Sequence, residues 1–216
     1  MNNFSPTQLG FDFSAREAGS PDLQVKKIPL PDADLQLFSG CFSAEEMILQ
    51  RLLSEIRWQQ DYLRFYGKEV AVPRLTAWYG DDGKEYTYSH ITMKPHPWTE
   101  LLLGIKGKAE ALSGVEYNSV LLNLYRSGAD GVSWHQDNEP ELGDDPVIAS
   151  VSFGATRIFQ MKHLKRKDIP RVDIPLVDGS LLVMGASTQR FWRHRIPKTE
   201  KAVGARVNLT FRYIRV

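Results

Sequence analysis

Three side chains in the second half of the sequence could together bind a metal ion. His135 and Asp137 lie in the segment WHQD, and a His-x-Asp spacing in extended backbone directs both side chains to the same side of the chain. Two histidines and one carboxylate form the facial triad that holds non-haem Fe(II) and leaves positions open for oxygen and a co-substrate. His194, in the later segment FWRHR, is the best candidate for the second histidine.

The other three histidines are weaker candidates for metal binding. His90 and His96 precede the predicted β core, and His163 lies inside a run of basic residues. We expect each of them to be a surface or packing residue. Zinc also accepts two histidines and a carboxylate, so the three predicted ligands by themselves leave zinc open.

One face of the C-terminal segment carries unusual polar side chains. Arg206, Asn208, Thr210 and Arg212 alternate with Val, Leu and Phe, so in a strand they share one side. Burying two unpaired guanidiniums would cost several kcal/mol. Either this face is exposed at a sheet edge, or it lines a pocket for a dianion, since arginine grips a carboxylate through two parallel hydrogen bonds.

The elements that must position these residues are two helices followed by many strands. Ser43 and Glu46 form a capping box before a helical apolar pattern, which predicts a helix over 44–58. A second apolar stripe predicts a helix over 98–112 that ends at Ser113-Gly114. From residue 117 onward, short apolar runs alternate with Gly, Pro and Asp, which is typical of strands. We therefore predict an all-β core with flanking helices, an α+β chain whose core is a sandwich, barrel or jelly roll.

Length and composition fit one ordinary globular domain. The chain has 216 residues, of which 42% are apolar and 25% charged, and one core can serve a chain of this size. Residues 1–22 lack any periodicity and are predicted to form a flexible N-terminal arm before a single domain over 23–216. Cys41 is the one cysteine, so no internal disulfide forms. We find no signal peptide or membrane span and expect a cytoplasmic monomer.

The charge is unevenly distributed along the sequence. Six Lys or Arg residues and one acid lie between Arg157 and Arg171, whereas Asp137 to Asp145 holds five acids and no base. Such a basic cluster could contact nucleic-acid phosphates. The alternative is a solvated surface loop.

Taken in order, these motifs resemble those of the AlkB family of Fe(II)- and 2-oxoglutarate-dependent dioxygenases. The similarity extends over about residues 60 to 216 and includes VPR at 72–74, YGD at 79–81, NLY at 123–125, SVSFG at 150–154 and DGSL at 178–181. The resemblance implies a double-stranded β-helix, or jelly roll, over 117–216, preceded by buttressing helices and a nucleotide-recognition lid within 60–115. It also implies that 2-oxoglutarate contacts Asn123, Tyr125, Arg206, Asn208 and Arg212.

Within that family the sequence is most similar to the branch that repairs alkylated DNA. The resemblance implies that Fe(II), O2 and 2-oxoglutarate are used to demethylate 1-methyladenine and 3-methylcytosine in single- or double-stranded DNA, with release of formaldehyde, succinate and CO2. Such an enzyme must flip the damaged base out of the duplex, and would act in the nucleoid of a bacterium or the nucleus of a eukaryote. The residues implied to contact the substrate are Tyr66 at the tip of a hairpin, Tyr86, Tyr88, Ser89 and Glu139 around the base, and Arg74, Lys165 and Arg166 at phosphates.

Three alternatives remain at this level. The same chemistry could act on methylated RNA, a free nucleotide or a protein side chain, because the iron and 2-oxoglutarate residues would be identical. A non-catalytic nucleic-acid-binding module is disfavoured because all three ligands and both Arg206 and Arg212 are present. A hydrolytic zinc protein would not need the second, dianion-binding face, so that face favours 2-oxoglutarate chemistry.

Overall fold

The computed structural model describes most of the chain beyond its first 22 residues. The described ranges are 23–42, 46–65, 67–84, 86–88, 91–185 and 187–215, without the side chains of 46, 65, 86–88 and 91–93. The predicted N-terminal arm therefore lies outside the described residues. Within those residues, the helices are too short or too polar to cross a membrane.

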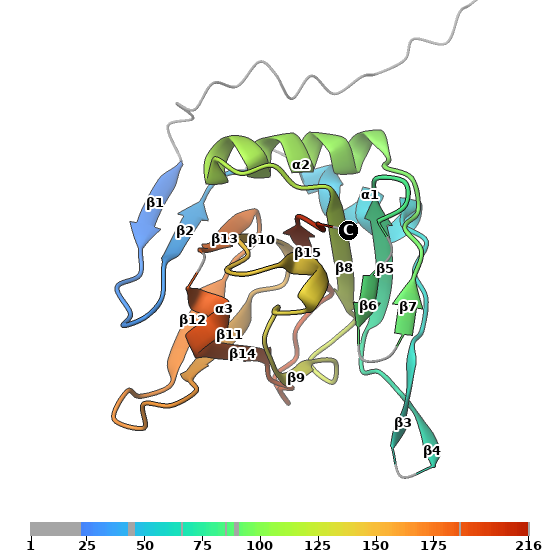
Figure 1. Ribbon diagram of the computed structural model, residues 1–216. Helices are drawn as coiled ribbons and strands as arrows, with labels where there is room; N and C mark the ends of the chain where they lie inside the picture. The colour runs from blue at the N-terminus through green and yellow to red at the C-terminus, as the bar shows by residue number, and fades with distance from the viewer. Residues whose placement is uncertain are drawn as a thin grey trace, which may run out of the picture.

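A large antiparallel sheet forms one wall of the molecule (Figure 1). Its strand order is β1-β2-β13-β10-β15-β8-β5, and every neighbouring pair is antiparallel. The strands are β1 (Gln24–Lys27), β2 (Leu35–Ser39), β5 (Leu75–Gly80), β8 (Ser119–Tyr125), β10 (Ile148–Gly154), β13 (Ser180–Met184) and β15 (Arg206–Arg212).

A smaller antiparallel sheet faces the large one. Its order is β12-β11-β14-β9, with β9 (Val132–His135), β11 (Arg157–His163), β12 (Val172–Leu176) and β14 (Trp192–Ile196). From β8 to β15 the chain passes back and forth between the two sheets, which is the arrangement of a jelly roll. The predicted all-β core with flanking helices is confirmed.

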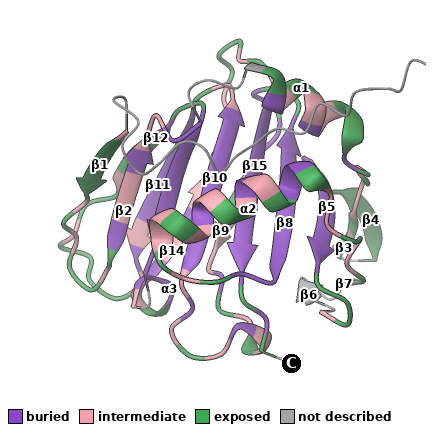
Figure 2. Ribbon diagram, turned by 90° about the horizontal axis from the view of Figure 1, so that it is seen from above, coloured by how far each residue is buried: buried purple, intermediate pink, exposed green. Residues whose placement is uncertain are grey.

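Two helices cover the outer face of the large sheet. Figure 2 shows α2 (Glu100–Ser113) lying across its buried strands, and α1 (Glu46–Glu55) lies near it. The α2 helix begins where Thr99 Oγ1 accepts a hydrogen bond from the Leu102 amide at 3.2 Å, and it ends at Gly114 in the left-handed region with φ +71°. These are the cap types that favour a helix start and stop. The prediction of a helix over 98–112 is thus correct to within two residues.

The first helix is shorter than predicted. It was expected over 44–58, but it ends at Glu55, and Gln59 pairs with the backbone of Thr76 in β5. The apolar residues after Glu55 continue the core contact without continuing the helix, because Ile56 is buried and the indole of Trp58 donates to the Leu52 carbonyl. The capping residue Ser43 lies outside the described residues.

Strand β15 separates two hydrophobic cores. Val207, Leu209 and Phe211 pack in the cluster that includes α1 and α2, whereas the alternate residues face the small sheet, where a second cluster includes Trp78, Met184 and Trp192. All seven residues of β15 are buried, because a central strand of a two-layer core is covered on both faces. The polar side of this strand therefore points into the interior between the two sheets.

The sheets extend beyond the predicted core range of 117–216. Strands β1, β2 and β5 precede residue 117 and join the large sheet at its two edges. The β1 segment QVKK is exposed at all four positions. Because neither of its faces is buried, its sequence shows no alternation of apolar and polar residues that would predict a strand. Two short helices, η2 (Pro140–Leu142) and α3 (Thr188–Phe191), lie in the connections.

Two hairpins lie outside the main sheets. The first pairs β3 (Tyr62–Phe65) with β4 (Lys68–Ala71), and the second pairs β6 (Tyr86–Tyr88) with β7 (Ile91–Met93). In Figure 1 the β3–β4 hairpin projects away from the body of the molecule. Its exposed residues include Tyr62 and Val70, which are 55% and 52% exposed.

Candidate active site

The three predicted metal ligands converge between the sheets. His135 ends β9 and lies directly opposite His194 of β14 in the strand register, and Asp137 follows two residues after the end of β9. The Nε2 atom of His194 is 3.7 Å from Oδ2 of Asp137. One donor atom from each of the three residues lies within 4.8 Å of the other two. Adjacent strands thus bring together ligands that are about sixty residues apart in the chain.

The protonation states of this group suit a metal ion. Burial and the neighbouring His135 lower the pKa of His194 to about 3, and burial also lowers the pKa of His135. Both imidazoles are therefore neutral near pH 7. Burial alone would raise the pKa of Asp137, but Arg212 and the two imidazoles outweigh it and lower that pKa to about 2. Neutral imidazole and ionised carboxylate are the forms that bind metals, and two histidines with one carboxylate fit Fe(II).

Neighbouring groups fix the orientation of each ligand. The Nδ1 atom of His135 lies 2.8 Å from the Ser133 carbonyl, which leaves Nε2 for a metal. The ring of His194 stacks on Phe159 with a centroid distance of 4.9 Å. Arg212 donates from Nη2 to Oδ1 of Asp137 at 2.6 Å. The carboxylate is therefore held ionised, with its other oxygen directed toward the histidines.

Gln189, on the short helix α3, contributes a support that the sequence did not reveal. It is 1% exposed, and its Oε1 accepts a hydrogen bond from the Asp137 amide at 3.0 Å. The Gln136 side chain in turn donates to the Gln189 carbonyl at 2.6 Å. These contacts fix the backbone that carries Asp137. A single glutamine in a connection has no spacing pattern that would distinguish it from a surface residue.

The polar face of β15 lines the same cavity as the three ligands. Arg206, Asn208, Thr210 and Arg212 are all among its lining residues, together with His135, Asp137 and His194. Of the two possibilities left by the sequence, an exposed edge is thus ruled out, because all four side chains are at most 8% exposed.

Arg206 is a buried cation with donors available. Its Nη2 donates to Ser152 Oγ at 3.0 Å, whereas Nε and Nη1 make no hydrogen bond to any described residue. Burial lowers its pKa to about 10, so the group is still charged near pH 7. Buried donors of a guanidinium are rarely left without acceptors, so these atoms indicate a site for an anion.

Asn208 plays a different part from Arg206. Its Nδ2 donates to Ser150 Oγ at 2.8 Å and to the Val151 carbonyl at 2.9 Å, while its Oδ1 accepts from Thr210 Oγ1 at 3.2 Å. Both amide hydrogens are therefore used within the wall. In this rotamer Asn208 offers a carboxylate only an oxygen, so it shapes the cavity without being able to donate to a dianion.

The remaining predicted co-substrate residues also line the cavity. Asn123 and Tyr125 belong to β8, next to β15, and Tyr125 lies directly opposite Arg206 in register. Arg74 was predicted to contact a phosphate, and the structure places its side chain in the cavity wall. It is only 6% exposed and lines the cavity, where its Nε donates to Asn123 Oδ1 at 2.7 Å. The contact of Arg74 with a phosphate stays a prediction.

Most of the other substrate-side predictions fall outside the described residues. Tyr66 and Ser89 are outside the described residues, as are the side chains of Tyr86 and Tyr88. Glu139 is partly buried at the start of η2 and is not among the residues that line the cavity. The roles of these five residues stay predictions.

The basic cluster divides into exposed and buried parts. Lys165 and Arg166 are exposed in the β11–β12 connection, and Arg166 pairs with Asp168 at 2.7 Å. Arg157, counted with them in the sequence, is only 3% exposed and donates to the carbonyls of Ser127, Asp130 and Pro197. His163, predicted as a surface or packing residue, is buried against the ring of Trp192.

Comparison with known proteins finds one family and several relatives that match most of this chain. The 2OG-Fe(II) oxygenase superfamily matches residues 36–212. The alpha-ketoglutarate-dependent dioxygenase alkB homolog 3 of Rattus norvegicus is 44% identical over 188 residues, which cover 82% of this chain and 63% of the rat protein. The DNA oxidative demethylase ALKBH2 of Homo sapiens is 38% identical over 192 residues, covering 85% of this chain and 73% of the human protein.

The alignments also define the extent of the similarity. This chain spans less than two thirds of the length of the homolog 3 proteins that it matches, whereas it covers 85% of ALKBH2 of Mus musculus at 35% identity. The solved structure of OsALKBH1 has a TM-score of 0.63 and 16% identity, covering 88% of this chain and all of that one. This likeness supports the jelly-roll fold.

Proposed function

This chain belongs to the AlkB family of Fe(II)- and 2-oxoglutarate-dependent dioxygenases, and from that premise we propose that it removes methyl groups oxidatively from N-alkylated bases in DNA. The expected substrates are 1-methyladenine and 3-methylcytosine. The products are the restored base, formaldehyde, succinate and CO2.

The observation that carries this proposal is that one cavity holds both the metal-donor set and the buried arginine wall. His135, Asp137 and His194 would hold Fe(II), and Arg206 would pair with the distal carboxylate of 2-oxoglutarate. The iron and its co-substrate, when bound, supply the oxidation of the N-methyl group by O2. A hydrolytic metal site would have no use for a second, cationic wall directed into the same space.

The chain's own residues would prepare the site for this chemistry. Arg212 keeps Asp137 ionised through the 2.6 Å ion pair. Arg206 offers the donors that have no acceptor among the described residues, and Tyr125 and Asn123 lie beside it in the wall. Because the cavity is enclosed between the two sheets, the charged groups act where water screens them little.

A nucleic-acid substrate is supported by the relatives, by the projecting β3–β4 hairpin and by exposed basic residues. The human relative is named a DNA oxidative demethylase. A base within a duplex cannot reach a buried cavity, so it must be extruded, and a projecting hairpin such as β3–β4 could fill the gap it leaves. The exposed Lys165 and Arg166 would contact phosphates. We propose action in the nucleoid or the nucleus accordingly.

The test is a repair assay with defined oligonucleotides. Protein loaded with Fe(II) under anaerobic conditions is mixed with O2, 2-oxoglutarate and strands that carry 1-methyladenine or 3-methylcytosine, in single-stranded DNA, duplex DNA and RNA. Mass spectrometry follows base restoration and formaldehyde. Restoration with equal amounts of succinate and formaldehyde supports the proposal, and preference for RNA would change the substrate class. Succinate release without restoration of any strand would overturn the proposed substrate.

A further inference from the structure

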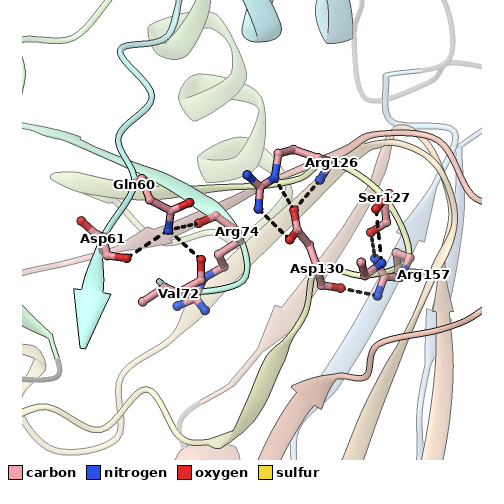
Figure 3. Close-up of polar contacts among 9 residues, drawn as sticks. Gln60, Asp61, Val72, Arg74, Arg126, Ser127, Asp130 and Arg157 are labelled. Carbon is pink, nitrogen blue, oxygen red and sulfur yellow. Dashed lines mark hydrogen bonds and ion pairs between the residues drawn. The ribbon is translucent and has the colours of Figure 1, made fainter. Parts of the chain in front are cut away.

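Arg157 lies behind the cavity, and the proposed reaction assigns it no part. It begins β11, where the chain enters the small sheet. Within the part of the chain that the structure describes, its guanidinium donates only to main-chain oxygens. Nη1 donates to the Ser127 carbonyl at 3.1 Å, and Nη2 donates to the carbonyls of Asp130 at 2.9 Å and Pro197 at 2.6 Å. Figure 3 shows the contacts with Ser127 and Asp130. Three carbonyls from two separate connections are thus tied to one side chain.

The first of these connections continues directly from the cavity wall. Tyr125 is the last residue of β8, and the connection 126–131 leads from it to the metal-binding strand β9. The carboxylate of Asp130 is engaged by Arg126, at 2.7 Å from Nε and 2.9 Å from Nη2 (Figure 3). Asp130 therefore offers Arg157 its carbonyl, while its carboxylate closes the loop on itself.

The two connections are pressed together without space for side chains. A Cβ atom on Gly128 would lie 2.3 Å from the Thr199 carbonyl oxygen, and one on Gly131 would lie 2.7 Å from that of Ile196. The Thr199 amide donates to the Gly128 carbonyl at 2.9 Å. Glycine is required by this close approach. Together with Arg157, these contacts hold the two connections against each other beside the strand ends that carry Tyr125 and Arg206.

Arg157 also contacts the wall itself through Tyr125. Its Cζ lies 5.7 Å from the centroid of the Tyr125 ring, and Cζ of Arg206 lies 5.2 Å from the same centroid. Two guanidiniums thus lie over one buried phenol, in the range of cation–π contacts. Since Arg157 is fixed by three carbonyls, it fixes the ring, and the ring in turn bounds the space available in front of Arg206.

We propose that Arg157 is a positioning residue that sets the length of dicarboxylate accepted at the Arg206 end of the cavity. This inference rests on the proposed function, in which 2-oxoglutarate pairs with Arg206. By holding Tyr125 and closing the loop 126–131 against Pro197, Arg157 excludes a diacid that is one methylene longer, such as 2-oxoadipate. It acts through Tyr125 and does not touch the co-substrate.

The test is calorimetric binding of 2-oxoglutarate and 2-oxoadipate to protein loaded with Mn(II), without O2, so that no turnover is needed. In Arg157→Met we expect the Kd for 2-oxoglutarate to rise about tenfold, because charged hydrogen bonds that position the wall are lost. The Kd of 2-oxoadipate should change less, so the selectivity ratio, the Kd of 2-oxoadipate divided by the Kd of 2-oxoglutarate, should fall. Unchanged constants and an unchanged ratio in a variant that melts as the wild type does would overturn the proposal.

Three further variants separate positioning from charge and from misfolding. Arg157→Lys keeps the charge but not the planar fork, so its ratio should be as low as that of Arg157→Met. Wild-type values of both constants in Arg157→Lys would show that only the charge matters and would contradict a positioning role. Gly128→Ala keeps the Arg157 side chain but separates the two connections, so it should also lower the ratio. This variant tests the proposal even if Arg157→Met does not fold. Arg171→Met, which removes only an exposed ion pair with Asp173 outside the loop 126–131, should keep the wild-type ratio. Absence of 2-oxoglutarate binding to the wild type would instead remove the proposed function.

Discussion

The arginines of the cavity and those of the β11–β12 connection use the same side chain in opposite ways. Arg206 and Arg212 are 1% and 2% exposed and line the same cavity as the metal-donor group. In contrast, Arg166 and Arg171 lie at the surface and pair with Asp168 and Asp173, two residues further along the chain. A buried charge interacts strongly with a bound ligand because little water screens it. Exposed pairs are screened and contribute little alone. The location of a guanidinium therefore decides how much its loss should cost.

The largest effect should follow from removing a ligand in the buried region. In His135→Ala, iron binding and base restoration should both be abolished, because the triad loses one of its two nitrogens. Metal content after dialysis and succinate formation are measured side by side. His96→Gln is the matched control, since His96 packs against Tyr79 and is not a lining residue of the cavity. Wild-type iron content in His135→Ala would remove this residue from the site.

Two arginine variants test whether burial decides the role of these side chains. Arg206→Met should raise the KM for 2-oxoglutarate by about a hundredfold, since a buried, charge-assisted carboxylate contact is lost. Arg171→Met, which removes an exposed pair, should leave that KM within about twofold. Initial rates over a range of 2-oxoglutarate concentrations give both values. Equal effects of the two variants would show that burial does not decide the role of these arginines.

The exposed basic residues should have a smaller effect that depends on salt. Replacing Lys165 and Arg166 by Gln should weaken DNA binding severalfold and reduce the slope of log Kd against log salt by about 0.9 for each lost phosphate contact. Fluorescence anisotropy with a labelled oligonucleotide, over a series of salt concentrations, measures this slope. The KM for 2-oxoglutarate should stay constant. An unchanged slope would place the nucleic acid elsewhere on the surface.

The smallest effect concerns stability in acid. The hydrogen bonds from Arg126 outweigh burial and lower the pKa of Asp130. A carboxyl group whose folded pKa is depressed stabilises the fold above its unfolded pKa of about 3.9, and this contribution is lost as the pH falls through the folded value. The difference in melting temperature between wild type and Asp130→Asn should thus be largest near pH 7 and shrink below about pH 4. A difference that is constant with pH would contradict the ion pair.

The sequence predicted those features that carry a periodic signal. The alternation of Arg206, Asn208, Thr210 and Arg212 with apolar residues predicted a strand with two unlike faces, and β15 has them. The spacing of His135 and Asp137 predicted their convergence, and the three proposed ligands lie together. Strand β1 could not be found, because its four residues are all exposed and leave no apolar pattern.

Burial of isolated charges was beyond what the sequence could predict. Arg157 was counted with Lys165 and Arg166 as part of one basic cluster, but its partners are carbonyls that only the fold brings near. Arg74 was assigned to phosphates for the same reason, although Asn123 binds it within the cavity. Charge alone does not reveal whether a side chain lies inside or outside, because tertiary contacts decide this.

The most direct test of the central claim, that one cavity binds the metal and 2-oxoglutarate together, is an anaerobic titration of 2-oxoglutarate into wild type, His135→Ala and Arg206→Met, each with and without Mn(II). We predict tight binding only to wild type with the metal, because each variant removes one of the two contacts that the cavity unites. Equal binding of 2-oxoglutarate to all three proteins, irrespective of metal, would contradict the account.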